Sequence, residues 1–487
     1  MSYQKFTKDI AIIGSTQALL ALKALIILPI ITKLIGAESY GIWSQLLITL
    51  SLLVPTVTLG LPYTLVRFLP GEKNKREIQD AIWSALAIVL ATSLIIALAI
   101  FLFSDNISEF FGGEKILVEL LSLAIIFECL NQVFLNSFRA FQQIKKYSFF
   151  IIFQNLGEIL LVAGTIFLGY NLSGAVLSLF IIRFINFLIM GFYITKEIKI
   201  KIPEFLKIKE YLRFGLPNVP GNISAWIIQS SDRYLIGFYL GTIFVGYYAP
   251  AYIIGSSINF ITTPITFILP VILSKLYDEN RISEVKNYLK YCLKYFLMVG
   301  IPFAFGISAL SVQLLATFST SEIADKSHNI IPLVATSALL FGIYGIIIQT
   351  ISLKKETKIA GLIWTASAFV NIGLNLIFIP RFGIMGAAIT TFIAYGMALV
   401  MAYCYSFQKF RFDIDWQSIS KSVLASAIMT SFVIWINPVG LFKITIVIIL
   451  SICIYIFLIF LFRGFSNTEI EILKKLLKNI NYKNNKS

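Results

Sequence analysis

The chain has 487 residues, of which 58% are hydrophobic and 13% are charged. A soluble globular chain carries about 25% charged residues, so this composition excludes a soluble enzyme, a nucleic-acid binder and a secreted disulfide scaffold. The net charge of +15 does not indicate nucleic-acid binding, because the basic residues stand in short segments between apolar runs. What remains is an all-α integral membrane protein with many spans.

The sequence contains no pattern of residues that is typical of catalysis or of metal binding. The four cysteines lie in apolar runs without CxxC spacing, and His328 is the only histidine. These residues predict neither a metal site nor a Ser-His-Asp triad. No glycine-Lys-Ser/Thr pattern of the Walker type occurs either. We therefore expect no catalytic residue, no metal and no cofactor, and a transporter rather than an enzyme.

Apolar runs of about 20 residues predict about fourteen transmembrane helices. The first run continues to about Ile31 without a small-residue cleavage site, so it is interpreted as a retained span and not as a signal peptide. The predicted spans are 10–32, 41–63, 81–103, 116–138, 148–169, 172–194, 213–236, 243–273, 288–310, 329–350, 359–379, 384–406, 418–436 and 441–463.

The distribution of basic residues predicts the orientation of these spans. If both termini are cytoplasmic, the inside segments carry 29 Lys and Arg residues and the outside connections carry 4. The positive-inside rule then places both ends in the cytoplasm. The longest inside connection, Lys196 to Arg213, is amphipathic. It is expected either to lie along the anionic inner membrane surface or to be a solvated linker.

Two segments of the chain repeat each other. LIGAESYGIW contains Gly36 and Gly41, and YLGTIFVGYY contains Gly241 and Gly246, at an offset of 205 residues. GYNLSGAVLSLF and RFGIMGAAITTF form a second pair, at an offset of 212. These pairs predict two parallel six-helix halves, an architecture of transporters. The expected domains are a first half at 1–195, a basic connection at 196–212, a second half at 213–408, two further helices at 409–465 and a cytoplasmic tail at 466–487.

Several polar residues are predicted to lie inside the membrane, where an ionisable group costs about 2.5–3.5 kcal/mol. The ionisable ones are Lys23, Glu128, Glu158, Arg183, Asp232 and Arg233. The span at 213–236 carries a polar stripe within roughly a 100° arc, which should face a polar or water-filled interior. Its members are Asn218, Asn222, Gln229, Asp232 and Arg233, and Trp364, Asn371 and Asn375 align in the same way on the span at 359–379.

Two interpretations of these groups stand side by side. The cations Lys23, Arg183 and Arg233 suit a bound anion such as a diphosphate. The buried carboxyl groups are then candidates for coupling to an ion gradient. Alternatively, the charged groups only join helices to one another, with Glu158 neutralising Arg183.

The fourteen spans, LIGAESYGIW, SSDRYLIGFYLGTIFVGYYAPAY and IFIPRFGIMGAAITTF together resemble the polysaccharide-biosynthesis flippases. These are the O-antigen-type branch of the multidrug/oligosaccharidyl-lipid/polysaccharide exporter superfamily, and the resemblance covers nearly the whole chain. It implies a V-shaped pair of six-helix halves with two further C-terminal helices, working by alternating access. It also implies translocation of a polyprenyl-diphosphate-linked oligosaccharide across the cytoplasmic membrane.

On this resemblance each polar residue has an expected role. The substrate-binding residues are Lys23, Arg183, Arg233, Asn218, Asn222, Gln229, Trp364, Asn371 and Asn375, and the ion-coupling residues are Glu128, Glu158 and Asp232. The expected partners are the lipid-linked oligosaccharide, membrane lipid, a coupling H⁺ or Na⁺, and glycosyltransferases or a polymerase of the same pathway. Two related functions stay open, a peptidoglycan-precursor flippase and a cation-coupled multidrug antiporter. The outside connections are too short for the catalytic domain of a glycosyltransferase.

Overall fold

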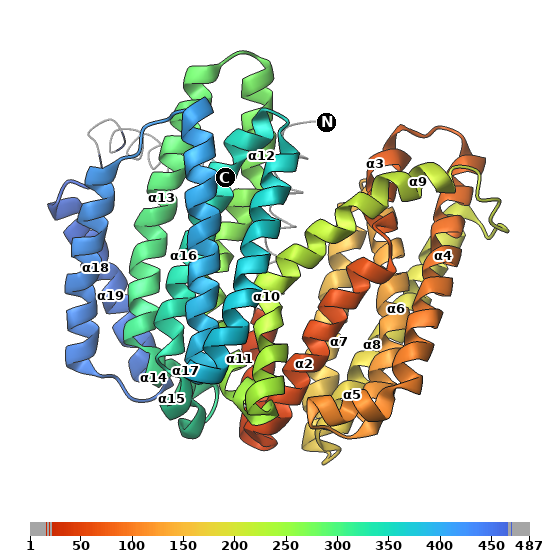
Figure 1. The fold of residues 1–487 in the computed structure, drawn as a ribbon, viewed down its shortest axis with the longest axis horizontal. Helices are drawn as coiled ribbons and strands as arrows, with labels where there is room; N and C mark the ends of the chain where they lie inside the picture. Colours follow the sequence, from red (N-terminus) through yellow and green to blue (C-terminus); the bar gives the residue numbers. More distant parts are fainter. Residues whose placement is uncertain (1–15, 17–18, 20–21, 466–468, 470–487) are drawn as a thin grey trace, which may run out of the picture. The chain divides into compact units, whose positions relative to one another are not determined.

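The computed structural model describes residues 16, 19, 22–465 and 469, and all regular structure in them is helical (Figure 1). Residues 22–34 are helical and precede α2. The helices are α2 (Gly36–Val57), α3 (Leu61–Phe68), α4 (Lys75–Leu102), α5 (Ser104–Phe111), α6 (Lys115–Ala140), α7 (Ile144–Phe167), α8 (Asn171–Ile198), α9 (Ile208–Gly215), α10 (Val219–Leu240), α11 (Thr242–Gly255), α12 (Asn259–Asp278), α13 (Ile282–Ala309), α14 (Ser311–Phe318), α15 (Ser321–Ser327), α16 (Ile330–Leu353), α17 (Thr357–Lys409), α18 (Trp416–Ile436) and α19 (Leu441–Leu461). Three short 3-10 turns are η1 (Leu69–Gly71), η2 (Leu216–Asn218) and η3 (Ser256–Ile258).

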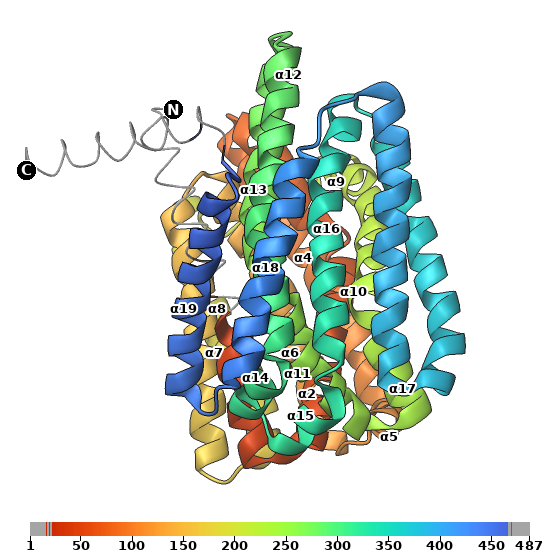
Figure 2. The same cartoon turned by 90° about the vertical axis from the view of Figure 1, so that its left-hand side faces the viewer.

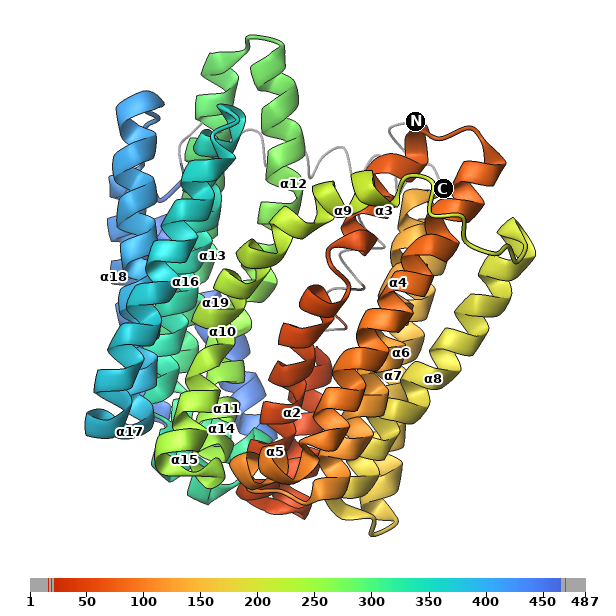
Figure 3. The same cartoon turned by 45° about the vertical axis from the view of Figure 1, so that its right-hand side comes forward.

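The described residues divide into two compact units. The first unit holds the residues up to Ile254 together with Phe318–Ile330 and Gly361–Met397. Within it, α6 packs against α2, α3, α4, α5, α7 and α8, and Figure 3 shows α4, α6, α7 and α8 side by side. Leu121, Ile125 and Val133 of α6 are fully buried in this core. An apolar helix surrounded by other helices on most sides is what a many-spanning bundle requires.

The second unit comprises Gly255–Thr317, Ile331–Ala360 and the residues from Ala398 onward. Here α13 packs against α12 and α18, and α18 packs against α19, as Figure 2 shows. α19 has a mean hydropathy of 3.2 and only 22% of its most apolar window is buried. A helix that is apolar all round and mostly unburied by protein is suited to contact with lipid.

The expected all-helical membrane fold is confirmed, and the chain is a multi-pass membrane protein. Eleven helices among the described residues have the length and composition to cross a membrane. One of them, α17, contains both spans expected at 359–379 and 384–406, and its backbone leaves the helical conformation between them, at Gly383. Most of the span expected at 10–32 lies outside the described residues, and α10 is not among the eleven. The number of fourteen spans is therefore not confirmed.

The basic connection between α8 and α10 is attached to the first unit. The Asp80 carboxylate, at the start of α4, accepts hydrogen bonds from the backbone N–H groups of Glu204, Phe205 and Leu206 at 2.5, 3.0 and 2.9 Å. Lys207 donates to Glu72 at 2.9 Å, and this hydrogen bond, with that from the backbone N–H of Asn74, lowers the pKa of Glu72 to about 2. The short helix α9 then packs on α3. The apolar side of the amphipathic connection is thus partly used for packing within the protein.

The repeated glycines occupy equivalent places in the structure. Gly36 begins α2 with φ 93°, and Gly241 precedes α11 with φ 95°. Five residues later in each repeat, Gly41 and Gly246 lie where α2 and α11 meet. A Cβ atom at Gly41 would collide with the carbonyl oxygen of Thr242, and one at Gly246 would collide with that of Ala37. The contact is reciprocal, which is the geometry of two elements related by a two-fold axis.

Candidate functional site

Four of the predicted charged residues form one ion-pair network in the first unit. Arg183 of α8 contacts Glu128 of α6 at 2.7 Å and Glu158 of α7 at 3.3 Å. The ammonium group of Lys23 contacts the other oxygen of Glu158 at 2.9 Å. The Glu158 side chain is 1% exposed and that of Lys23 is 21% exposed. The network therefore runs from a fully buried carboxylate to a partly accessible lysine.

Amide side chains surround this network. Glu128 accepts hydrogen bonds from Gln132 and Gln154 at 3.0 and 2.9 Å, and Gln154 accepts one from Asn186 at 2.8 Å. Two cations and two carboxylates neutralise one another, as buried charges require. Lys23 and Arg183, predicted to bind an anion, are thus held by Glu128 and Glu158. The pairing of Glu158 with Arg183, considered above as a joint between helices, is present in the structure.

The predicted polar stripe on the helix at 213–236 divides into an exposed part and a buried part. Asn218, Asn222 and Gln229 are exposed, whereas Asp232 and Arg233 are buried. Asn218 lies in η2 and not in α10, because Pro217 and Pro220 interrupt the helix there. Exposed amide groups on a helix of a membrane protein require water or polar partners and not lipid tails.

The buried part of the stripe contacts tyrosines of α11. Tyr248 donates a hydrogen bond to the Asp232 carboxylate at 2.5 Å, and the other carboxylate oxygen accepts the backbone N–H of Arg233. The Arg233 guanidinium lies over the ring of Tyr252, 4.4 Å from its centroid, in a cation–π contact. Among the described residues, no carboxylate forms an ion pair with Arg233, and its Nε atom has no hydrogen-bond partner. Its positive charge is therefore uncompensated by direct contact.

The asparagines of α17 form a separate polar cluster. The amide of Asn375 donates to the Asn371 side-chain oxygen at 3.1 Å, and Thr390 donates to Asn375. Both asparagines are fully buried, and the Asn371 amide nitrogen has no hydrogen-bond partner among the described residues. Trp364 meets Tyr395 edge to face, with centroids 6.3 Å apart. Of the three residues predicted to align on this span, Trp364 thus makes an aromatic contact and the two asparagines form a hydrogen-bonded pair.

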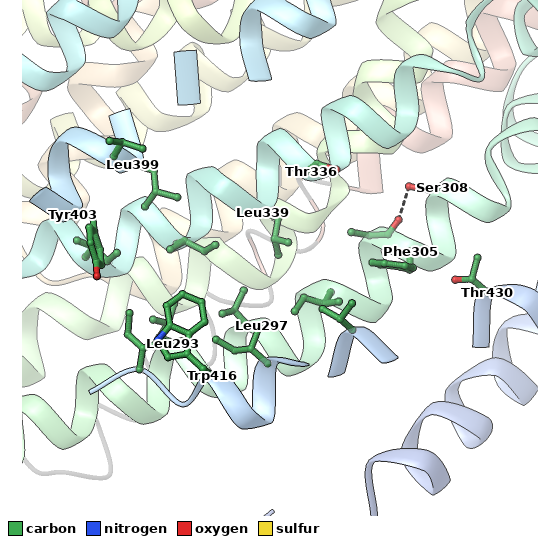
Figure 4. A pocket seen from close by; sticks show the side chains of 18 of the residues that line it. Leu293, Leu297, Phe305, Ser308, Thr336, Leu339, Leu399, Tyr403, Trp416 and Thr430 are labelled. Carbon is green, nitrogen blue, oxygen red and sulfur yellow. Dashed lines mark hydrogen bonds between the residues drawn. The ribbon is translucent and has the colours of Figure 1, made fainter. Parts of the chain in front are cut away.

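An apolar cavity of about 970 Å³ lies in the second unit (Figure 4). Side chains of α13, α16, α18 and the end of α17 line it, among them Leu297, Phe305, Leu339, Tyr403 and Trp416. Its volume is at the upper end of the range for ligand pockets. The few polar side chains of the lining, such as Ser308 and Thr430, leave it suited to a hydrocarbon chain. Sequence reasoning did not find this cavity, because its lining has the same composition as a lipid-facing helix surface.

Two further polar groups were also missed from the sequence. Gln45 is fully buried on α2, and neither oxygen nor nitrogen of its amide has a hydrogen-bond partner among the described residues. Tyr252 carries the cation–π contact with Arg233. The one sequence signal that could have identified Gln45 is that it is a lone glutamine in an apolar span. In the described part of the chain, no group of three or more His, Cys, Asp or Glu side chains has the arrangement to hold a metal ion.

Two family models and two curated relatives match the chain. The family model described as polysaccharide biosynthesis protein matches residues 6–276, and that described as lipid II flippase MurJ matches residues 247–460. The chain is 22% identical over 405 residues to a probable low-salt glycan biosynthesis flippase, Agl15, of Haloferax volcanii, covering 81% of this chain and 83% of the relative. A probable flippase of the same organism, AglR, is 25% identical over 203 residues, covering 40% of this chain and 41% of the relative.

Solved structures show the same fold. Lipid II flippase MurJ in an inward closed conformation gives a TM-score of 0.73 at 18% identity, with coverage of 94% of this chain and 99% of the other. An inward-facing multidrug resistance MATE family transporter of the MOP superfamily gives 0.68 at 16% identity, covering 80% and 94%. These likenesses establish the fold, and the match over residues 6–276 extends over more than half of the sequence. The chain therefore belongs to the polysaccharide biosynthesis protein family.

Proposed function

We propose that the protein is a flippase that moves a polyprenyl-diphosphate-linked oligosaccharide across the cytoplasmic membrane by alternating access. The observation that carries the proposal is the presence, in one membrane chain of this family, of an apolar cavity of about 970 Å³ and of an exposed polar face on α10. The substrate also has an apolar part, the isoprenoid chain, and a polar part, the sugars. An isoprenoid chain gains about 0.8 kcal/mol per buried CH₂ group, and sugar hydroxyls need hydrogen-bond partners.

On this proposal, different polar residues bind different parts of the substrate. Asn218, Asn222 and Gln229 present amide groups to the sugars, with Trp364, Asn371 and Asn375 as further contacts. Arg233 is the predicted cation that no carboxylate contacts in the described structure, so we assign it to an anionic group of the substrate. Lys23 and Arg183 bind a diphosphate only by exchanging their glutamate partners. Such an exchange would free Glu128 or Glu158 to take up H⁺ or Na⁺, and Asp232 is the third candidate for ion coupling.

The orientation and partners follow from the same proposal. We infer that both termini lie on the cytoplasmic side and that the basic connection faces the anionic leaflet there. Glycosyltransferases that build the oligosaccharide supply the substrate on that side, and a polymerase consumes it on the other side. Cysteines introduced at Asn171 and Arg381 should react with an impermeant maleimide from outside, and one at Lys354 from inside. The reverse pattern would refute this orientation.

A peptidoglycan-precursor flippase is the second candidate, favoured by the match of the MurJ family model to residues 247–460. The substrate of such a flippase differs from a lipid-linked oligosaccharide in its sugar part and not in its diphosphate carrier. The test is a flip assay in proteoliposomes that compares a lipid-diphosphate oligosaccharide, a lipid-linked peptidoglycan precursor and a cationic dye under an ion gradient. Flipping of the first substrate alone supports the proposal. Flipping of the second alone, or efflux of the dye alone, would replace it with the corresponding related function.

A further inference from the structure

Trp226 of α10 lies among exposed amide side chains. Asn222 precedes it by four residues and Gln229 follows it by three, so the three side chains leave the helix within an arc of about 60°. Both amides are exposed, and neither has a hydrogen-bond partner among the described residues. The indole ring between them is partly exposed. This face of α10 therefore presents an aromatic surface together with amide groups that no described residue engages.

The indole ring is held in place by α2 and by a second aromatic residue. Its N–H donates to the Ile48 carbonyl oxygen and to the Ser51 hydroxyl, both at 3.0 Å. The ring of Tyr234 lies beside it, with centroids 5.6 Å apart and planes inclined at 51°. Tyr234 is itself hydrogen-bonded to Thr49 of α2 at 2.5 Å. Because these contacts fix the ring in advance, little conformational entropy is lost when a ligand packs on it.

Contact with lipid does not account for this face. A tryptophan at a membrane interface directs its N–H toward water and lipid headgroups, whereas the N–H of Trp226 is directed at α2. Gln229 lies about 15 Å along α10 from its first residue, and it is still exposed. An amide at that depth would lack hydrogen-bond partners among lipid tails. The face of Asn222, Trp226 and Gln229 therefore borders water or a polar ligand.

We propose that Trp226 is a stacking platform for one pyranose ring of the transported oligosaccharide, with Asn222 and Gln229 as hydrogen-bond partners of hydroxyl groups at the edge of that ring. The inference rests on the proposed function and names a feature of its substrate. A pyranose whose hydroxyl groups are mostly equatorial, such as glucose, has an apolar face of C–H groups that packs on an indole ring. Its hydroxyl groups then point outward in the plane of the sugar, where amide groups donate to them and accept from them.

The first experiment measures protection of the indole ring in the wild-type, full-length protein in detergent. A short pulse of hydroxyl radicals is applied with free cellotriose or with sorbitol, an open-chain hexitol without a ring face, at equal hydroxyl concentration. Mass spectrometry then gives the oxidation of each tryptophan. Near saturation, cellotriose should slow the oxidation of Trp226 at least about twofold relative to sorbitol. Trp435, at 82% exposure on α18, should be oxidised equally with both. Equal oxidation of Trp226 with the two compounds would overturn the proposal.

Two variants separate a stacking platform from a joint between α10 and α2. Trp226→Phe keeps an aromatic face and loses the N–H, whereas Trp226→Leu loses both. In the flip assay with lipid-diphosphate-linked cellotriose, Trp226→Leu should raise the KM about tenfold, and Trp226→Phe should raise it much less. If the hydrogen bonds to Ile48 and Ser51 are the whole role of Trp226, the two variants should be equally impaired, which would overturn the proposal. Trp435→Leu is the matched control and should transport like the wild type.

The two experiments keep this site and the flippase function apart, because protection by free cellotriose requires neither a lipid carrier nor transport. Protection of Trp226 in a protein that flips no lipid-linked oligosaccharide would refute the function and leave the sugar site standing. Flipping by the wild type without protection of Trp226, and with an unchanged KM in Trp226→Leu, would refute the site and leave the function standing. Should Trp226→Leu fail to fold, protection in the wild type and the KM of Trp226→Phe decide the matter.

Discussion

Gly41 and Gly246 stand 205 residues apart in the sequence, and their backbones are in contact. A Cβ atom on Gly41 would lie only 2.9 Å from the backbone nitrogen of Gly246. The contact is reciprocal. Gly41 of α2 lies against the carbonyl group of Thr242 of α11, and Gly246 of α11 lies against the carbonyl group of Ala37 of α2. Equivalent residues of two repeats therefore pack on each other, and only glycine permits so close an approach of two helix backbones.

The first prediction concerns this contact. Gly41→Ala or Gly246→Ala should push α2 away from α11 and loosen the packing around the buried Gln45. In a background with the four native cysteines replaced by alanine, a cysteine at Gln45 should then react with a maleimide several times faster than with both glycines intact. Gly164→Ala is the control, because nothing lies within 4 Å of its added Cβ. An unchanged reaction rate in both glycine variants would contradict the role of this contact.

The second prediction concerns the ion-pair network. Glu158→Gln removes the carboxylate shared by Lys23 and Arg183 and leaves two poorly compensated cations. Breaking a buried pair on one side costs about 3–5 kcal/mol. The variant should therefore unfold at a clearly lower temperature in detergent, whereas Glu109→Gln, at an exposed position, should not. The double variant Glu158→Gln/Arg183→Met should recover part of the loss, and a loss equal to the sum of the two single variants would show that the residues act independently.

The third prediction concerns the cytoplasmic connection. Asp80→Asn replaces an acceptor of three backbone hydrogen bonds by an amide with one oxygen. At least one of the N–H groups of Glu204, Phe205 and Leu206 then loses its partner, at a cost of about 1–3 kcal/mol. Trypsin should cut after Lys201 or Lys207 faster than in the wild type. Asp105→Asn, at an exposed carboxylate, should leave the cleavage pattern as it is.

A pH dependence follows for the same connection. The pKa of Glu72 is lowered in the folded protein, so its pairing with Lys207 stabilises the connection above the ordinary pKa of a glutamate. That stabilisation is lost only as the pH falls from about 4.5 toward about 2. Amide hydrogen exchange at residues 204–207, corrected for the intrinsic rate, should therefore be equally protected at pH 7 and pH 5. A loss of protection between these values would contradict the lowered pKa.

The sequence was informative where physical signals are local. Apolar length predicted most helices, and the repeated glycines occupy comparable places, such as Gly41 and Gly246, in α2 and α11. The partners of the charged residues were not predictable, because Lys23 and Glu158 are 135 residues apart and meet only through tertiary packing. For the same reason, Gln45 gave no sign from sequence that Gly237 faces it.

The last prediction concerns the apolar cavity and the length of the lipid carrier. Ile343→Trp places a large side chain in the lining on α16 and should reduce the space for a long isoprenoid chain. Val299→Trp adds a similar volume on α13, at a side chain that is 52% exposed and outside the lining, and serves as the control. In the flip assay, Ile343→Trp should slow a long-chain polyprenyl substrate about tenfold relative to Val299→Trp. A short-chain analogue with the same sugars should be affected much less, because it leaves most of the cavity empty. Equal slowing of both substrates would show that the substitution disturbs the helices, and equal rates in the two variants would show that the chain does not enter the cavity.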